Sequence, residues 1–354
     1  MDFDNCAAEV DHPTLARYVM ETSGDSEMTI LMNAMALSFK VIQRDVRKAG
    51  IADLYGLAGT GNASGDDVKK LDVLSNDIMV NALTNCRACC ILVSEEEENI
   101  IIVDEDKQGS FVVAFDPLDG SSNIDCNVST GTIFSVWKKT SEGAPTLADA
   151  LRPGSEMVAA GYCMYGAATD LVLTLGVGKG VLRFTLDPSI GEFIQCEKLT
   201  FPEKYKTIYS CNEGNFATWS PEIQQCVTDF KTQKPKPFSA RYVGSMVSDL
   251  HRSILYGGVF LYPADSKSPN GKLRLMYEGY PMAMLIEEAG GSASTGMFKG
   301  GIGRIMEIVP EGIHARCPII MGNTELVDRV LGYYKDANTP PPPPTVGEKR
   351  KEHS

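Results

Sequence analysis

Two carboxylates stand three residues apart directly after an apolar run. Asp116 and Asp119 belong to the segment Asp-Pro-Leu-Asp-Gly-Ser-Ser, which follows the apolar residues 111–115. Pro117 favours a turn that would bring both carboxylates to one side, and the small residues after Asp119 leave backbone N–H groups free to face an anion. Because Mg²⁺ prefers oxygen ligands and commonly joins carboxylates to a substrate phosphate, the segment predicts a magnesium and phosphate site. A plain surface turn is the alternative, and the apolar strand before it makes that alternative weaker.

A second acidic group follows another apolar run, at residues 91–93. Glu95 and Glu96 come first after that run, so they are placed to reach a site at the carboxyl end of a strand, where ligands of open α/β sheets collect. We interpret residues 97–98, which are also glutamates, as a solvated loop. Asp72 lies on the preceding predicted helix, where it could position a water or simply face solvent.

Glu278 and a set of basic and phenolic residues complete the candidates. Glu278 stands just before a helix predicted at 281–289, so it is either a partner of the helix dipole or another metal ligand, and composition alone favours the dipole. Arginine and lysine are the expected ligands of a phosphate held away from the carboxylates. The candidates of this kind are Arg241, Tyr242, Tyr262, Lys272 and Arg274.

Apolar periodicity predicts the elements that must position these residues. Helices are expected at 27–48, 68–83, 245–255, 281–289 and 323–335, and strands at 90–93, 100–103, 111–115, 132–137, 171–177, 181–186, 259–262 and 319–321. The strands at 90–93, 100–103 and 111–115 are expected to be buried on both faces. Residues 51–66, which are rich in glycine, predict a long loop.

Composition and charge narrow the class of protein. The chain has 354 residues, and 33 Lys and Arg against 46 Asp and Glu give a net charge of −13. This acidity argues against nucleic acid as a partner, because affinity for nucleic acid depends largely on basic residues. No stretch approaches the length of a membrane span and the N-terminus lacks the pattern of a signal peptide, so we expect a cytoplasmic protein without a membrane partner.

The cysteines predict reduced thiols. Ten of them are scattered over the chain, which is typical of a cytosolic protein rather than a disulfide-stapled one. Cys86 and Cys89 form a lone Cys-x-x-Cys pair with no second pair and no nearby histidine. We therefore favour buried thiols at a helix end over a zinc site.

Together these motifs resemble the fructose-1,6-bisphosphatase family, over roughly residues 10–335. The Asp-Pro-Leu-Asp-Gly-Ser motif is common to the wider superfamily of magnesium-dependent, lithium-sensitive phosphatases, which includes the inositol monophosphatases. The segments with Arg241 and Lys272 indicate a sugar bisphosphate instead. The segments that carry the resemblance are 69–77, 92–96, 115–125, 241–246 and 268–274.

The resemblance implies an α/β fold, a layered α/β/α/β/α sandwich of the sugar-phosphatase type, assembled as a homotetramer. It implies an N-terminal half at 1–200 with regulatory helices, a mobile loop that includes Tyr55, and the metal carboxylates. A C-terminal half at 201–335 would bind the sugar phosphate, and 336–354 would be a disordered, proline-rich tail. The implied activity is magnesium-assisted attack of water on the 1-phosphate of fructose 1,6-bisphosphate, which gives fructose 6-phosphate and phosphate, a gluconeogenic step.

The resemblance also assigns residues. Metal ligands would be Glu95, Glu96, Asp116, Asp119, Glu278 and the carbonyl of Leu118, with Mn²⁺ or Zn²⁺ as substitutes for Mg²⁺. Asp72 and Glu96 would orient or deprotonate the attacking water. The 1-phosphate would meet backbone donors around Asp119, Gly120, Ser121 and Ser122. The 6-phosphate would meet Asn212, Tyr242, Tyr262 and Lys272, with Arg241 from a neighbouring subunit, and the sugar would contact Gly244, Ser245 and Met246.

An allosteric AMP site is implied near the first predicted helix. Its residues would be Gly24, Glu27, Met28, Thr29, Ser110, Phe111 and Lys138. AMP-sensitive members of the family carry a Lys-Tyr pair where this chain has Ser110 and Phe111, and an Arg where it has Lys138. A charge and a hydroxyl are therefore missing, and we expect weakened inhibition by AMP.

Three other functions compete with this interpretation. The enzyme could also take sedoheptulose 1,7-bisphosphate, or it could be an inositol-phosphate phosphatase, which would have no second phosphate to meet the basic residues. A protein that senses a metabolite without catalysis would have lost metal carboxylates. All six candidate carboxylates are present: Asp72, Glu95, Glu96, Asp116, Asp119 and Glu278.

Overall fold

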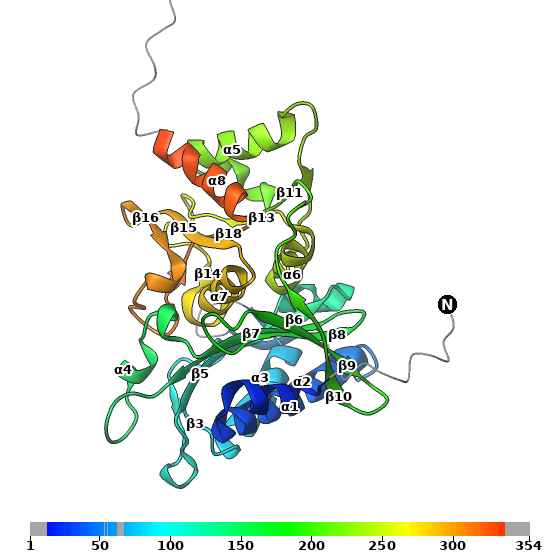
Figure 1. Cartoon of the computed structure of the whole chain (residues 1–354), viewed down its shortest axis with the longest axis vertical. Helices are drawn as coiled ribbons and strands as arrows, with labels where there is room; N and C mark the ends of the chain where they lie inside the picture. The colour runs from blue at the N-terminus through cyan, green and yellow to red at the C-terminus, as the bar shows by residue number, and fades with distance from the viewer. Residues whose placement is uncertain (1–12, 53, 55, 62–66, 337–354) are drawn as a thin grey trace, which may run out of the picture.

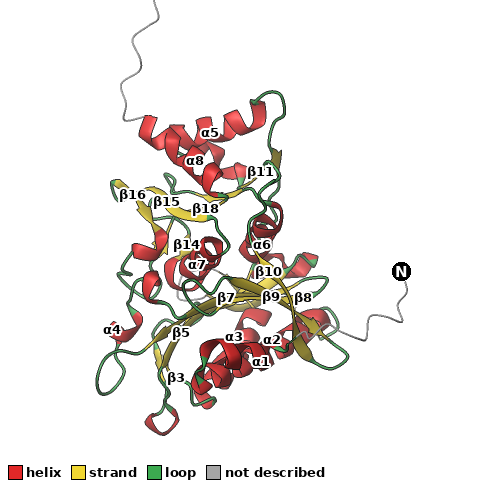
Figure 2. Ribbon diagram, viewed as in Figure 1, coloured by secondary structure: helices red, strands yellow, loops and turns green. Residues whose placement is uncertain are grey.

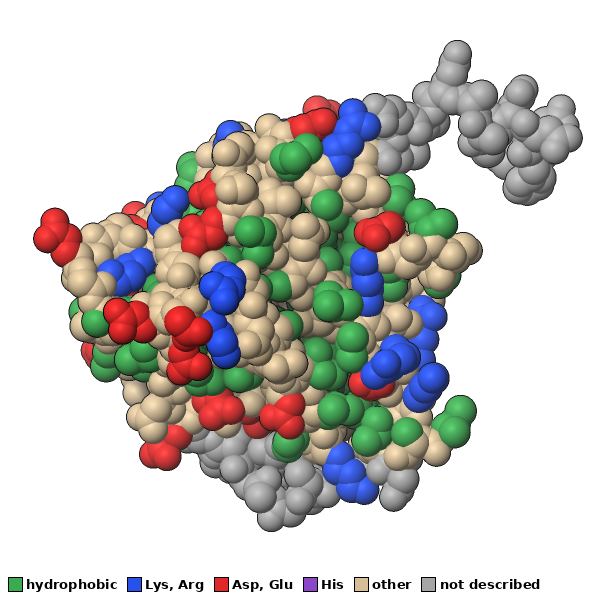
Figure 3. All heavy atoms as spheres, turned by 90° about the horizontal axis from the view of Figure 1, so that it is seen from below, with side chains coloured by type: hydrophobic (Ala, Val, Ile, Leu, Met, Phe, Trp, Pro, Cys, Tyr) green, Lys and Arg blue, Asp and Glu red, His purple; other side chains and the backbone are tan. Residues whose placement is uncertain are grey.

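The computed structural model describes residues 13–52, 54, 56–61 and 67–336. Helices and sheets alternate in five layers (Figures 1 and 2), which confirms the predicted layered sandwich. The first layer holds α1 (Leu15–Ser23), α2 (Ser26–Lys48) and α3 (Lys70–Asn85). Seen from outside, the face over this layer carries side chains of both charge signs (Figure 3).

The second layer is an eight-stranded sheet in the order β10-β9-β8-β7-β6-β5-β3-β4. Its strands are β3 (Cys89–Ser94), β4 (Ile101–Ile102), β5 (Phe111–Asp119), β6 (Thr130–Lys138), β7 (Ala159–Tyr165), β8 (Thr169–Thr174), β9 (Val181–Asp187) and β10 (Glu192–Leu199). β8 and β9, where the sequence predicted strands at 171–177 and 181–186, pair antiparallel as neighbours.

The remaining layers come from later residues. α6 (Met246–Tyr256) and α7 (Tyr280–Glu288) lie between the two sheets, and α5 (Pro221–Thr232) and α8 (Thr324–Asp336) cover the far side of the second sheet (Figure 1). That sheet has six strands in the order β12-β11-β13-β18-β15-β16. They are β11 (Ile208–Ser210), β12 (Ser239–Ala240), β13 (Val259–Tyr262), β15 (Ser292–Phe298), β16 (Gly301–Arg304) and β18 (Ile319–Gly322), and β14 (Leu273–Arg274) pairs with β17 (Arg316–Cys317) nearby.

Two predictions about local structure are corrected. The strand expected at 100–103 is only the two-residue β4 at the sheet edge, where Ile102 is half exposed rather than buried on both faces. Within the loop expected at 51–66, the described part contains β1 (Leu57–Gly61), which pairs antiparallel with β2 (Asp67–Lys69). Tyr55 and the tail from residue 337 lie outside the described residues.

The packing of β3 against β5 decides where the chemistry lies. The two strands are parallel neighbours with every residue buried, so their carboxyl ends meet at the same sheet edge. β5 does not stop at residue 115 for a turn, as the sequence predicted. It runs through Pro117 to Asp119, and its pairing with β6 shifts register between Asp116 and Asp119. The tertiary amide of proline has no N–H to donate to a regular ladder, and such an irregularity re-aims side chains near sites.

Candidate active site

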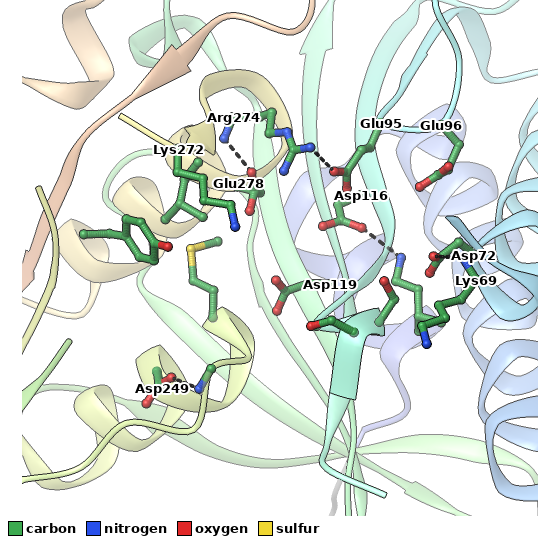
Figure 4. Close-up of a pocket in the computed structure, with 18 of the residues that line it drawn as sticks. Lys69, Asp72, Glu95, Glu96, Asp116, Asp119, Asp249, Lys272, Arg274 and Glu278 are labelled. Carbon is green, nitrogen blue, oxygen red and sulfur yellow. Dashed lines mark hydrogen bonds and ion pairs between the residues drawn. The ribbon is translucent and has the colours of Figure 1, made fainter. Parts of the chain in front are cut away.

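A pocket of about 470 Å³ opens at this sheet edge and is lined from both halves of the chain. Figure 4 shows the acidic residues that follow β3, lie on β5 or lie on α3, facing residues from the second half of the chain. The lining includes these predicted residues: Asp72, Glu95, Glu96, Asp116, Leu118, Asp119, Gly120, Ser121, Ser122, Tyr242, Gly244, Met246, Tyr262, Lys272 and Glu278.

Three buried carboxylates converge in the pocket. Oxygen atoms of Asp116, Asp119 and Glu278 all lie within 4.8 Å of one another, and each residue is at most 7 % exposed. Of the two alternatives for Glu278, the role as a partner of the helix dipole, which composition favoured, is therefore wrong. A turn of π-helix at Leu275–Gly279, just before α7, carries this carboxylate into the cluster, and such turns are frequent at functional sites.

Hydrogen bonds fix each of the three carboxylates. Asp116 accepts from the N–H of Leu118 at 2.9 Å. Asp119 accepts from the N–H of Val247 at 3.0 Å, and the hydroxyl of Ser245 lies 3.4 Å from the same oxygen. Glu278 accepts from the N–H of Arg274 at 2.5 Å. These bonds hold the carboxylates in place although their charges repel one another.

Among the described residues, Arg274 is the cation whose ion pair reaches the acidic wall of the pocket. The guanidinium of Arg274 lies 2.9 Å from a carboxylate oxygen of Glu95, and both side chains are largely buried. The sequence placed Arg274 among residues for a distant phosphate, and the structure corrects this, because the side chain faces the acidic wall of the pocket (Figure 4). A single guanidinium cannot neutralise all the carboxylates that gather here.

Because the negative charges of these carboxylates are not fully neutralised, their pKa values are raised. Burial is the main cause that raises the pKa of Asp119 to about 7, and Glu95 adds to it. Burial likewise raises the pKa of Glu278 to about 8, against the lowering effect of Arg274. The pKa of Asp116 is also raised, by burial and then by Glu95, Asp119 and Glu278. Raised pKa values show that these buried carboxylates lack a sufficient positive partner. A divalent cation bound to their oxygen atoms would supply one.

Asp72 and Glu96 lie together at one side of the cluster (Figure 4). Asp72 sits in the first turn of α3, where its carboxylate accepts from the N–H of Lys69 at 2.8 Å. Burial raises its pKa to about 6. A carboxylate with a pKa near the working pH is suited to accept a proton. Glu97, predicted as a solvated loop residue, instead accepts from the amide of Asn76 at 2.8 Å.

The opposite wall of the pocket carries phenolic and cationic groups. Tyr242, Tyr262 and Lys272 line it, away from the buried carboxylates. Buried Asp249 supports the loop before α6 by accepting from the N–H groups of Val243 and Gly244 at 3.0 Å each. Asp249 and Lys69 also line the pocket and were not predicted. Asp249 has no distinctive sequence signal, because an aspartate in a first helical turn usually serves the helix dipole.

Gly120 packs where a side chain would not fit. Its φ is +80°, and a Cβ there would lie 2.8 Å from the Cβ of Ser245. The glycine therefore lets the segment that follows Asp119 approach the loop before α6.

Three predicted residues do not line the pocket. Ser245 is buried behind Asp119, and the side chain of Asn212 accepts from the N–H of Gly214. Arg241 lies at a separate hollow, together with Lys206, Lys236 and Arg252. Within this chain, then, Arg241 does not meet the pocket.

The residues predicted for AMP gather at the start of α2. The carboxylate of Glu27 accepts from the N–H and the hydroxyl of Ser110, at 2.5 and 2.6 Å. Lys138 lies 3.2 Å from Asp25, which caps the helix. Met28, Phe111 and Lys138 border a small cavity of about 190 Å³ there, and Gly24 and Thr29 lie on either side of the helix start.

Comparisons with known proteins agree over nearly the whole described chain. Residues 13–198 match the family model "Fructose-1-6-bisphosphatase, N-terminal domain", and residues 202–335 match "Fructose-1-6-bisphosphatase, C-terminal domain". The chain is 51% identical over 338 residues to fructose-1,6-bisphosphatase 1 of Bos taurus, covering 94% of this chain and 98% of the relative. It is 49% identical to the cytosolic fructose-1,6-bisphosphatase of Oryza coarctata, covering 94% and 97%. The solved holo form of Leishmania major fructose-1,6-bisphosphatase superposes with a TM-score of 0.87 and 42% identity, covering 92% of this chain and 100% of that one.

None of the helices among the described residues has the length and apolar character needed to cross a membrane.

Proposed function

The chain belongs to the fructose-1,6-bisphosphatase family, and we propose that its acidic pocket hydrolyses the 1-phosphate of the substrate with bound magnesium. It is a phosphatase that converts fructose 1,6-bisphosphate to fructose 6-phosphate and phosphate, a step of gluconeogenesis. The observation that carries the metal-dependent mechanism is the convergence of three buried carboxylates within 4.8 Å.

The donor set fits a hard divalent cation. Oxygen ligands alone, from Glu95, Asp116, Asp119 and Glu278 with the carbonyl of Leu118, are what Mg²⁺ prefers. Bound magnesium would neutralise phosphoryl oxygens, lower the pKa of the attacking water and stabilise the leaving alkoxide. Mn²⁺ or Zn²⁺ would serve as substitutes, since both accept carboxylate ligands.

Asp72 and Glu96 would handle the attacking water. Their carboxylates would accept its hydrogen bonds and so orient a lone pair toward phosphorus, and both side chains line the pocket. Burial raises the pKa of Asp72 to about 6, which leaves it mostly ionised, yet basic enough to receive a proton, at neutral pH. In-line attack needs this positioning more than it needs covalent chemistry from the protein.

The two walls of the pocket would orient the substrate. The 1-phosphate would lie beside Asp119 and the backbone of 120–122, and the 6-phosphate beside Lys272, Tyr242 and Tyr262. Gly244 and Met246 would contact the sugar between them. An inositol monophosphate would leave the cationic wall without a partner, which favours the sugar bisphosphate.

Assembly, regulation and location complete the proposal. We propose a homotetramer in which Arg241 of one subunit supports the 6-phosphate site of another, because Arg241 does not line the pocket of its own chain. AMP inhibition would be weak, because the hydroxyl of Ser110 is already bonded to Glu27. We also propose a cytosolic location, which the relative named cytosolic from Oryza coarctata supports. The proposed division of the chain is into an N-terminal half at 1–200 and a C-terminal half at 201–335.

Release of phosphate from fructose 1,6-bisphosphate tests the proposal. The assay compares Mg²⁺ with EDTA for the wild type, for Asp119→Ala and for a matched control, Asp104→Ala, whose side chain is 78% exposed. We expect release with Mg²⁺ in the wild type and the control, and none in EDTA or in Asp119→Ala. Release that persists in EDTA would contradict the metal-assisted mechanism. Faster release from inositol 1-phosphate would contradict the assignment of the substrate.

A further inference from the structure

Two cysteines meet at the junction between α3 and β3. Cys86 directly follows the last residue of α3, and Cys89 is the first residue of β3. Arg87, between them, has a φ of +64°, the left-handed conformation that ends many helices and reverses the chain. The reversal brings the two sulfur atoms to 4.0 Å of each other, and both thiols are free.

We propose that Cys86 and Cys89 form a reversible disulfide, which makes this junction a thiol-redox modification site. The sulfur atoms must approach by about 2 Å to reach the bonded distance. Cys86 supplies this movement, because it lies past the last helical residue and is partly exposed. Cys89 is held in the sheet, where its carbonyl accepts from the N–H of Gly109 at 3.0 Å.

The two thiols differ in pKa and in exposure, and the two successive steps of thiol exchange require such a difference. A hydrogen bond from Cys89 lowers the pKa of the Cys86 thiol to about 7. The same hydrogen bond and burial raise the pKa of Cys89 well above its usual range. Cys86 is therefore the accessible thiolate that attacks, and Cys89 is the protected thiol that resolves.

The reaction balances with a small-molecule disulfide such as oxidised glutathione as the oxidant. The Cys86 thiolate attacks one glutathione sulfur, the glutathione S–S bond breaks, and one glutathione thiolate leaves. The Cys89 sulfur then attacks Cys86, the mixed disulfide breaks, and the Cys89 proton passes to the second departing glutathione. Two protein thiols are oxidised and one glutathione disulfide is reduced to two thiols.

The other described cysteines offer no equivalent pair. Cys90 is buried, its thiol donates to the carbonyl of Phe111, and burial raises its pKa to about 11. Cys126 is exposed, and its thiol faces the carbonyl of Asn123 rather than a second sulfur. Among the residues that the structure describes, the contact between Cys86 and Cys89 is the sulfur–sulfur contact that it records.

The site connects the two elements that bring catalytic carboxylates to the pocket. α3 carries Asp72 in its first turn, and β3 leads directly to Glu95 and Glu96. The cysteines lie at the opposite ends of both elements. A bond there would tie the end of α3 to the start of β3 without touching the pocket itself.

Peptide mapping tests the proposal. Trypsin cuts after Lys70, Arg87 and Lys107, so Cys86 and Cys89 fall on the separate peptides 71–87 and 88–107. The reduced, full-length protein is incubated with oxidised glutathione, its remaining thiols are alkylated, and the digest is analysed by mass spectrometry. We expect the two peptides to be joined in the wild type and separated by dithiothreitol.

Matched variants identify the sulfur atoms. Cys89→Ala should leave glutathione on peptide 71–87 without a cross-link, whereas Cys90→Ala and Cys126→Ala should keep the cross-link. Unchanged phosphatase activity of each reduced variant shows that it is folded. A wild type with glutathione on Cys86 but no joined peptides would overturn the proposal, and so would a cross-link that survives in Cys89→Ala.

Discussion

The acidic pocket and the cluster at the start of α2 both gather charged residues from distant parts of the chain, but only one of them is balanced. At α2, Glu27 accepts two hydrogen bonds from Ser110, and Lys138 pairs with Asp25. In the pocket, three buried carboxylates face one another, and the nearby guanidinium of Arg274 contacts Glu95.

The pocket therefore still needs a ligand to neutralise its carboxylates, whereas the polar groups at the start of α2 already have partners within the chain. Buried like charges that the fold holds together by hydrogen bonds cost stability, and they persist where function requires them. The cluster at α2 has used its polar atoms on internal partners. A ligand would have to break those contacts before it could bind.

The largest expected effect comes from neutralising one carboxylate in each region. Asp116→Asn should reduce kcat for phosphate release about a thousandfold, because it removes a negative charge from the carboxylate cluster that we propose to hold Mg²⁺. Glu27→Gln should leave kcat within about twofold, since Glu27 lies at the start of α2 and does not line the pocket. Steady-state kinetics at saturating Mg²⁺ measures both. Equal losses in the two variants would break the contrast between the regions.

A smaller effect is expected at the cationic wall of the pocket. Lys272→Ala should raise KM for fructose 1,6-bisphosphate about 10- to 100-fold with less change in kcat, because a charge-assisted hydrogen bond contributes about 1.5–3 kcal/mol. Lys267→Ala, at an exposed neighbouring lysine, is the matched control and should leave KM unchanged. A Lys272→Ala enzyme with wild-type KM would show that the second phosphate binds elsewhere.

The smallest effect concerns AMP. Replacing Ser110 by Lys together with Phe111→Tyr adds a cation and a hydroxyl, and should tighten inhibition by AMP about tenfold, as one added polar contact would. The KM for the sugar bisphosphate should stay unchanged, which serves as the internal control. Inhibition of the wild type at saturating Mg²⁺ as strong as that of AMP-sensitive family members would contradict the expected weakening.

Local patterns predicted the strands and the acidic residues that follow them, whereas the layered sandwich was predicted through the family resemblance. Apolar runs marked β3 and β5, and the carboxylates after them were expected at one sheet edge, where the structure places them. The turn expected at Pro117 was wrong, because pairing with β6 on the neighbouring side keeps β5 extended to Asp119. Sheet pairing is a long-range interaction that overrides a local turn preference.

The remaining errors have the same origin. Glu278 was interpreted as a partner of the helix dipole because no local sequence pattern predicts the π-helical turn that buries it. Arg274 looked like a phosphate ligand because Lys272 is its near neighbour, yet the folded chain brings Glu95 from β3 to 2.9 Å from its guanidinium, a long-range contact that no local pattern shows. Asp249 was missed because its partners, the N–H groups of Val243 and Gly244, become apparent only when the loop has folded.

The most direct test of the central claim, that the pocket is an unbalanced acidic cluster that Mg²⁺ stabilises, is the free energy of unfolding at two pH values. Burial raises the pKa of Asp119 to about 7 and that of Glu278 to about 8. The folded chain then holds protons that the unfolded chain has released, so in EDTA stability should fall as pH rises from about 5 to about 8. Urea unfolding at fixed protein concentration should show this fall, and Mg²⁺ should reverse it at about pH 8 in the wild type but much less in Asp119→Asn. A free energy of unfolding at about pH 8 that is the same in Mg²⁺ and in EDTA would contradict the account.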